Sequence, residues 1–209
     1  MELYGYWRSS AAYRVRIVLN FLKLDCQLIP VHLVKDGGEQ HTQSYKSKNP
    51  NALVPCLVDG DVTLNQSLAI IDYLQDKSDA YDFLQGDKYA IKAFAYDIAC
   101  EIHPVNNLRI QQYLANELSV NDTDKMQWVH HWMHTGFKAL EAKLEKSSGL
   151  YCFGDAITLA DVCLIPQVYN ALRFKLDMSA YPNISRIYQA CNELIEFEQA
   201  KPENQADAI

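Results

Sequence analysis

The sequence predicts an α/β domain followed by an all-helical domain. Strand-like and helix-like patterns alternate through the first 75 residues, in the order β-α-β-α-β-β-α. The polar stretch Lys77–Lys88 follows, and beyond it the strand patterns stop. From there to about residue 200, apolar residues recur at the three- and four-residue spacing of amphipathic helices. We therefore expect two domains, spanning residues 1–78 and 86–209.

Each element of the first domain has a local cause. Alternating, aromatic-rich residues favour strands, Ser9 and Ser10 are candidate helix caps, and Asp59-Gly60 between two apolar runs is typical of a hairpin turn. The predicted elements are the strand Glu2–Trp7, a helix from Ser9 or Ser10 to about Lys23, the strand Cys26–Leu33, a short helix near Gln40–Ser47, the strands Leu53–Val58 and Val62–Leu64, and a helix from Gln66 to about Asp76.

The second domain is predicted from helical periodicity alone. Thr158 followed by Asp161 matches a capping box, in which the acidic side chain reaches back to the helix start. The polar residues Lys201–Ile209, with Pro202 among them, are typical of a frayed end. The predicted helices are Tyr89–Leu118, bent near Pro104, then Asp122–Lys146, Cys163–Phe174 after the capping box, and Pro182–Ala200.

Composition excludes several classes of partner. The 19 basic and 26 acidic residues give a net charge of −7, which does not suit a nucleic-acid surface. No apolar run approaches the ~20 residues that span a bilayer, and the first residues lack a signal-peptide pattern. Six widely spaced cysteines without Cys-x-x-Cys are typical of reduced thiols. We expect a cytoplasmic protein that binds neither nucleic acid nor membrane.

Three segments place polar groups where a backbone can receive an anion. Ser9-Ser10 lies where a strand turns into a helix, and the free N–H groups at a helix start favour negative charge. Val54-Pro55 starts a strand and is a candidate cis peptide bond. Gln66-Ser67 opens the next helix with an amide and a hydroxyl. Taken alone, the first segment is explained most simply by plain helix capping.

In this order, the three segments resemble the glutathione site of the glutathione transferase family, and more narrowly of its zeta class. The resemblance implies a thioredoxin-like N-terminal domain, a helical glutathione-transferase C-terminal domain and glutathione as cofactor. It also implies an isomerase that converts maleylacetoacetate from its cis to its trans form in tyrosine and phenylalanine catabolism. The similar segments run through nearly the whole chain: Arg8-Ser9-Ser10 with Arg14–Ile17, Asn49-Pro50, Leu53–Pro55, Gln66–Ile71, Tyr151–Asp155, Thr158–Asp161, Pro166–Val168 and Arg173-Phe174.

The same resemblance implies the glutathione-contacting residues. Ser9 matches the serine that faces the sulfur and Ser10 its neighbour, although the sequence leaves the reverse assignment open. Ala11 stands where the family signature has Cys; a hydroxyl is the usual partner of the sulfur, so we expect activity to survive. The residues implied to contact glutathione are Ser9, Ser10, Ala11, Arg14, Gln40, Val54, Gln66, Ser67, Asn106 and Asn107.

A small dicarboxylate substrate requires cationic side chains, and the planar fork of arginine suits a carboxylate. On a helix, His103 and Asn107 would share one face at i,i+4 spacing, and Asn106 and Arg109 are spaced i,i+3. Arg14 and Arg16 are expected to be mainly structural. The residues implied to contact the substrate are Arg8, His103, Asn107, Arg109 and Arg173.

Other interpretations stay open. His130 and His134 have the i,i+4 spacing of a metal pair, but no acid stands between them as in His-Glu-x-x-His, so we expect no metal. The alternative functions are a maleylpyruvate isomerase of gentisate breakdown, a general glutathione transferase, and a related binding protein without catalysis. The family resemblance also implies a homodimer.

Overall fold

The computed structural model describes residues 1–208 and divides into two compact units. The first unit contains Met1–Asp82 together with the chain from Glu193 onward, and the second contains Phe83–Asn192. The division between Asp82 and Phe83 falls in the segment that the sequence left between its two predicted domains, residues 79–85. The residues from 193 onward belong with the first unit, whereas the sequence assigned them to the helical domain.

The first unit is built on a four-stranded sheet with strand order β2-β1-β3-β4. β1 runs parallel to β2 and antiparallel to β3, and β3 and β4 form the predicted hairpin. The predicted element order is confirmed. Its elements are β1 Glu2–Gly5, α1 Ser10–Leu22, β2 Gln27–Pro30, the 3-10 turns Lys35–Gly37 and Glu39–His41, α2 Gln43–Lys46, β3 Cys56–Asp59, β4 Val62–Asn65, α3 Ser67–Gln75, α9 Ile195–Ala200 and the 3-10 turn Pro202–Asn204.

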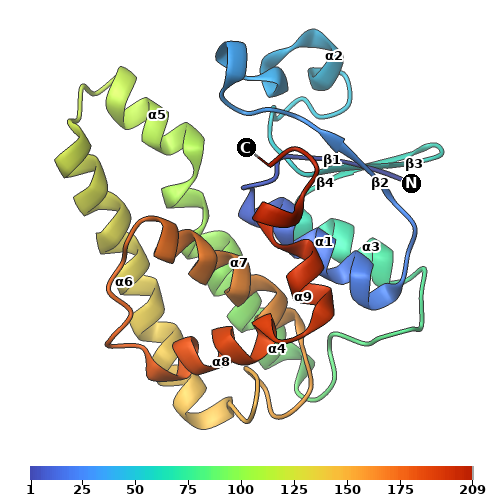
Figure 1. Ribbon diagram of the computed structural model, residues 1–209, viewed down its shortest axis with the longest axis vertical. Helices are drawn as coiled ribbons and strands as arrows, with labels where there is room; N and C mark the ends of the chain where they lie inside the picture. The colour runs from blue at the N-terminus through green and yellow to red at the C-terminus, as the bar shows by residue number, and fades with distance from the viewer. Residues whose placement is uncertain (209) are drawn as a thin grey trace. The chain divides into compact units, whose positions relative to one another are not determined.

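Alternating side chains give this sheet two buried faces. Tyr4 and Cys56 pack with Tyr45 beside α2 on one face, so their strand neighbours Leu3 and Leu57 point to the other. Figure 1 shows α1 and α3 on that second face and α2 on the first. α1 contacts both α3 and α9, which explains why its apolar residues are buried around most of the helix.

The second unit is all helical, as predicted. On α6, the residues Val129, Met133, Phe137, Leu140 and Leu144 form the buried row, while Trp128 lies partly exposed beside it. The Thr158–Asp161 capping box is present, and α7 begins at Leu159 directly after the Thr158 cap, four residues earlier than predicted. The elements are α4 Lys88–Tyr96, a π-helix Asp97–Ile102, a 3-10 turn Pro104–Asn106, α5 Leu108–Asn116, α6 Asp122–Ser147, α7 Leu159–Arg173 and α8 Pro182–Asn192.

The single helix predicted over Tyr89–Leu118 is wrong. The chain passes from α4 through the π-helix and the 3-10 turn before α5 starts. Pro104 lacks the N–H that would continue the helix, and Asn107 adopts an extended conformation and caps α5 with its side chain. Residues 103–107 therefore form a break between helices.

The single helix predicted over Pro182–Ala200 is also wrong. The frayed end predicted from Lys201 onward is wrong within residues 201–208, where Pro202–Asn204 forms a 3-10 turn and Asp207 accepts from the Trp7 N–H; Ile209 lies outside the described residues. α8 ends at Asn192 and α9 is a separate helix in the first unit. Phe197 of α9 is fully buried and packs edge-on against Phe21 of α1, with ring centroids 5.8 Å apart. Local polarity could not reveal this packing, because its partners lie about 180 residues away in the sequence.

Candidate functional site

The turn Tyr6–Ser9 connects β1 to α1 and presents the first candidate residue. The Ser9 N–H donates to the Tyr6 carbonyl at 2.9 Å and closes the turn. The Ser9 Oγ accepts from the Ala12 N–H at 3.1 Å, so Ser9 caps α1 as predicted. A hydroxyl both accepts and donates, so this cap leaves the O–H proton of half-buried Ser9 for a further acceptor.

Ser10 and Ala11 occupy the first two positions of α1. Amides in a first helical turn carry the positive end of the helix dipole. The Ser10 side chain is buried, with 6 % of its surface exposed, whereas Ser9 is more open. An anion at this helix start would therefore meet the Ser9 hydroxyl more readily than the Ser10 hydroxyl.

Arg14 joins the start of α1 to the start of α3. Its side chain is 2 % exposed, and its Nη1 donates to the Ser67 Oγ at 3.3 Å. Within residues 1–208, its Nε and Nη2 are buried and have no hydrogen-bond partner. Burying a cation with unpaired donors is costly, so this guanidinium fits an anionic partner such as a ligand carboxylate. This environment fits the glutathione contact that the family resemblance implied for Arg14.

Strand pairing brings the other two candidate segments together. Cys56 of β3 pairs with Asn65 of β4, so Val54-Pro55 before β3 and Gln66-Ser67 after β4 lie at the same end of the hairpin. The Val54–Pro55 peptide bond is cis. Gln66 has a φ of 68°, an uncommon conformation for a residue other than glycine, and such outliers concentrate at functional sites.

A network that the sequence analysis missed holds the Val54 segment in place. The Leu53 carbonyl accepts from the Tyr45 hydroxyl at 2.6 Å and from the Asn49 Nδ2 at 2.7 Å. The Asn49 Oδ1 accepts from the Asn65 Nδ2 at 3.1 Å and from the Asn51 N–H at 3.1 Å. The sequence analysis names Asn49-Pro50 only as a family-like segment; the Asx-turn pattern of Asn49 and Asn51 is the local signal for this network.

Gln40 and Arg8 complete the candidates of the first unit. Gln40 is buried, its Nε2 donates to the Leu33 carbonyl at 3.2 Å, and its Oε1 has no partner among the described residues. Arg8 is exposed; its guanidinium stacks over Trp7 at 4.6 Å and donates to the Tyr6 hydroxyl at 3.0 Å. Stacking leaves the outer edge of Arg8 oriented but open to an anion.

In the second unit, His103 and Asn107 do not share a helix face as expected, and no continuous helix joins Asn106 to Arg109. His103, Asn106 and Asn107 lie in the break before α5, where helical spacing does not apply. The Asn107 Oδ1 accepts from the Ile110 N–H at 3.2 Å and caps α5, so part of its side chain is already used. Asn106 is buried and donates to the Ile102 carbonyl at 3.1 Å, while its Oδ1 has no partner in the described chain.

Two exposed arginines of the second unit, Arg109 and Arg173, are candidates from the sequence. Arg109 lies in the first turn of α5, where the helix dipole disfavours a cation, so its position is not explained by helix stability. Arg173 ends α7; it stacks over Phe174 at 4.1 Å and donates to the Asn170 Oδ1 at 2.9 Å. Both side chains lie at the surface.

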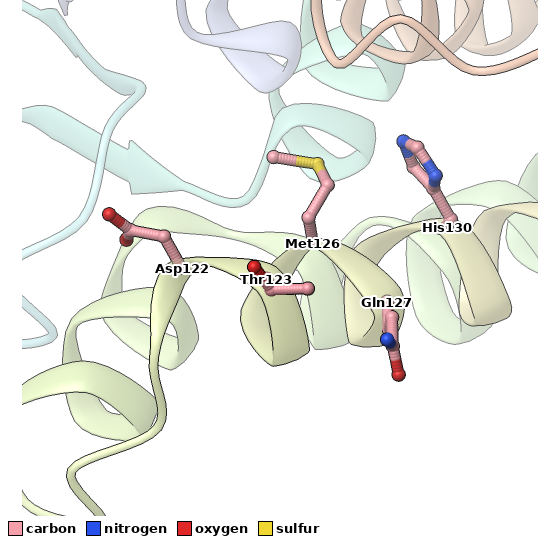
Figure 2. A pocket seen from close by; sticks show the side chains of 5 residues that line it. All are labelled: Asp122, Thr123, Met126, Gln127 and His130. Atoms are coloured by element: carbon pink, nitrogen blue, oxygen red, sulfur yellow. The ribbon is translucent and has the colours of Figure 1, made fainter.

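The depression along α6 is a weaker candidate. Figure 2 shows that its lining comes from one helix: Asp122, Thr123, Met126, Gln127 and His130. Asp122 is paired with Lys125 at 2.6 Å, and the His130 Nε2 lies 2.8 Å from the Phe174 carbonyl. No group of metal-ligating side chains occurs within residues 1–208.

No helix in the part of the chain that the structure describes is long and apolar enough to cross a membrane.

The cysteines are all free, and most are buried. Burial raises the pKa of the Cys56, Cys152 and Cys191 thiols and raises that of Cys26 to about 11. Cys100 is exposed. We therefore expect one fast phase with a disulfide reagent under native conditions, abolished in Cys100→Ser and retained in Cys26→Ser. Fast labelling of Cys56, measured by mass spectrometry, would contradict this picture.

Comparisons with known proteins agree with this architecture. Residues 3–81 match the model of the glutathione S-transferase N-terminal domain, and residues 133–190 match that of the C-terminal domain. A Vibrio cholerae protein named probable maleylacetoacetate isomerase is 52 % identical over 209 residues, covering 99 % of this chain and 97 % of its own.

Two solved structures are similar over the full length of both chains. One is the holo structure of a maleylpyruvate isomerase described as a bacterial zeta-class glutathione S-transferase, with a TM-score of 0.96 and 38 % identity. The other is a maleylacetoacetate isomerase from Methylobacterium extorquens AM1 with bound malonate and glutathione, with a TM-score of 0.95 and 33 % identity. The chain belongs to the glutathione S-transferase family, and within that family to the zeta class.

Proposed function

We propose that the protein is a glutathione-dependent isomerase that converts maleylacetoacetate to fumarylacetoacetate in tyrosine and phenylalanine catabolism. The observation that carries the proposal is the buried Arg14 guanidinium, with unpaired donors beside Ser67. The Vibrio relative at 52 % identity supports the choice of substrate. Six free thiols support a reducing compartment, and we propose the cytoplasm.

Glutathione fits the donors of the first unit. Arg14 and Ser67 provide cationic and hydroxyl donors for a carboxylate at the start of α3, and the backbone at Val54 is held rigidly by its network. Gln40 contributes an unpaired amide oxygen that suits an ammonium or amide group. In the solved relative from Methylobacterium extorquens, glutathione is bound.

Ser9 has the task of stabilising a negative sulfur. When bound, glutathione supplies a thiolate that adds reversibly to the cis double bond, so the bond can rotate. Ser9 donates its O–H proton to the sulfur, and the first-turn amides of α1 add the positive end of the helix dipole. Hydrogen bonding to a charged form lowers the pKa of a thiol, so both effects favour the thiolate at neutral pH.

The substrate carboxylates require cations that do not move while the centre of the molecule rotates. Arg109, Arg173 and Arg8 are exposed cations, and the last two are oriented by stacking on aromatic rings. We assign them to the carboxylates, with His103 and Asn107 as further polar contacts. We also propose that glutathione contacts Asn106 and the side-chain Nδ2 of Asn107, whose Oδ1 caps α5.

Each alternative predicts a different outcome. A maleylpyruvate isomerase would use the same groups on a shorter dicarboxylate, and the solved structure at 38 % identity favours keeping this alternative. A general transferase acting on apolar electrophiles would not need exposed arginines. A binding protein would not need Ser9 in a position to donate to sulfur.

The test is a pair of initial-rate assays with maleylacetoacetate and maleylpyruvate, each with and without glutathione. We expect glutathione-dependent turnover with a higher kcat/KM for maleylacetoacetate. A higher value for maleylpyruvate would overturn the substrate assignment, and rates independent of glutathione would overturn the mechanism.

We also propose a homodimer. α4 exposes Tyr89 and Tyr96, which are seven residues apart and therefore lie on one face, and exposed large apolar residues are typical of interfaces. Sedimentation at micromolar concentration is expected to give about twice the chain mass of 23.9 kDa. A species of one chain mass under these conditions would contradict the proposal.

A further inference from the structure

The C-terminal segment, residues 193–208, packs along α1 within the first unit. Figure 1 shows α9 beside α1, and the contacts between them are specific. The Asn20 Nδ2 donates to the Glu196 carbonyl at 2.8 Å, and the Arg16 Nε donates to the Ala200 carbonyl at 3.0 Å. With Phe197 fully buried, this segment is anchored independently of its last residues.

Beyond this anchor, the segment reaches the turn that carries Ser9. The Trp7 N–H donates to the Asp207 Oδ2 at 3.1 Å. The Trp7 carbonyl accepts from the Arg16 Nη2 at 3.0 Å, and the same guanidinium donates to the carbonyl of Ala200. Both backbone polar groups of Trp7 are therefore held by contacts that include the C-terminal segment.

Trp7 is the second residue of the Tyr6–Ser9 turn. The turn is closed at Ser9 by the bond from its N–H to the Tyr6 carbonyl, so the orientation of the Trp7 peptide groups helps set where Ser9 lies. The Trp7 side chain is 8 % exposed and supports the Arg8 guanidinium. A carboxylate that fixes the Trp7 N–H thus acts on both the turn that places Ser9 and the ring that supports Arg8.

We propose that Asp207 is a positioning residue that fixes the Tyr6–Ser9 turn and thereby the hydroxyl of Ser9. The inference rests on the proposed function, since it assigns Asp207 a role at the glutathione sulfur. The side chain of Asp207 is suited to this task, because its carboxylate oxygen accepts from the Trp7 N–H at 3.1 Å. Without it, the turn keeps its closing bond but gains freedom at Trp7.

The experiment compares three variants of the full chain. Asp207→Ala removes the acceptor, Asp207→Asn keeps one acceptor oxygen, and Ser78→Ala is the control. The Ser78 Oγ donates to the Leu22 carbonyl at 3.2 Å, so its loss weakens the far end of α1 without touching the turn. The measurements are thermal unfolding, kcat, glutathione affinity by calorimetry, and the titration of the bound thiol by its ultraviolet thiolate absorbance.

Asp207→Ala is expected to lower kcat by about 3- to 10-fold, the size of one ordinary hydrogen bond, and to raise the pKa of the bound thiol. Asp207→Asn is expected to bring kcat and the pKa of the bound thiol most of the way back to wild type. Ser78→Ala is expected to lower the melting temperature while leaving kcat and the thiol pKa unchanged. The thiol titration separates positioning from stability, because a merely structural loss would not move it.

Two results overturn the inference alone: a wild-type thiol titration and kcat in Asp207→Ala, or equal losses in Asp207→Ala and Ser78→Ala. If Asp207→Ala does not fold, Asp207→Asn becomes the deciding variant. A folded Asn variant whose bound thiol titrates near wild type supports the inference, and a tenfold loss of kcat in that variant overturns it. Absence of glutathione binding by the wild-type chain overturns the proposed function itself.

Discussion

Replacing Arg109 or Arg173 with Met is expected to lower kcat/KM for the dicarboxylate by about 30- to 5,000-fold. Truncating one partner of a hydrogen-bonded charge pair in a partly dry site costs about 2–5 kcal/mol, and each 1.36 kcal/mol is a factor of ten in rate. Met keeps most of the apolar stem and removes the charge. Glutathione affinity should stay within about twofold of wild type, because its proposed carboxylate contacts Arg14 and Ser67 lie in the first unit.

The matched control is Lys138→Met, which removes an exposed cation from α6 of the same unit. This variant should leave both the kcat/KM for the dicarboxylate and the glutathione affinity unchanged. A solvent-exposed ion pair is worth about 0–1 kcal/mol, so effects below threefold in both arginine variants would identify them as ordinary surface charges. That result would remove the main physical support for a dicarboxylate substrate.

Replacing Ser9 with Ala is expected to reduce turnover by about 10- to 150-fold and to raise the pKa of bound glutathione. A hydrogen bond to a charged acceptor contributes about 1.5–3 kcal/mol. Ser10→Ala should have a smaller effect, because Ser10 is buried within the first turn of α1. The ultraviolet absorbance of the thiolate measures the titration directly, and an unchanged titration in Ser9→Ala would show that the sulfur assignment is wrong.

Ser9 also caps α1, so the chemical and structural losses must be separated. Asn is as good a helix cap as Ser but has no hydroxyl, whereas Thr keeps both the cap and the hydroxyl. Ser9→Asn should therefore melt near wild type and still lose turnover, and Ser9→Thr should recover turnover. If Ser9→Asn were as active as wild type, the role of Ser9 would be capping alone.

The parts of the fold that the sequence predicted are those with local causes. The Ser9 cap, the Asp59-Gly60 hairpin and the Thr158–Asp161 capping box each depend on residues within a few positions of one another. The second unit was likewise predicted by helical spacing. Neighbouring residues were sufficient because propensity, capping and turn chemistry all favoured the same elements.

The parts that sequence analysis missed depend on contacts that local pattern does not encode. The break at Pro104 was treated as a bend, although Asn107 also offered an N-cap that could start a new helix. The polarity of the residues after Ala200 predicts a frayed end, but Asp207 accepts a hydrogen bond from the Trp7 N–H. The burial of Phe197 against Phe21 is likewise a long-range contact that helical periodicity does not encode. Burial of Arg14 was also invisible, since its unpaired donors appear only once α1 and α3 are packed together.

The candidate site likewise combines features that local sequence predicts with features that depend on long-range contacts. Segments beginning at Ser9, Val54 and Gln66 were found from their residues, and strand pairing then brings the last two to one end of a hairpin. The network of Tyr45, Asn49 and Asn65 was not found, because its hydrogen bonds join residues from a short helix, a loop and a strand.

The most direct test of the account is the balance of glutathione during turnover of maleylacetoacetate. Purified protein is incubated with excess substrate and a limiting, known amount of glutathione, and free thiol and trans product are measured together over time. An isomerase releases the sulfur in every cycle, so we predict many equivalents of fumarylacetoacetate per glutathione with the thiol concentration unchanged. Loss of one thiol for each substrate molecule consumed, or no trans product at all, would contradict the proposed function.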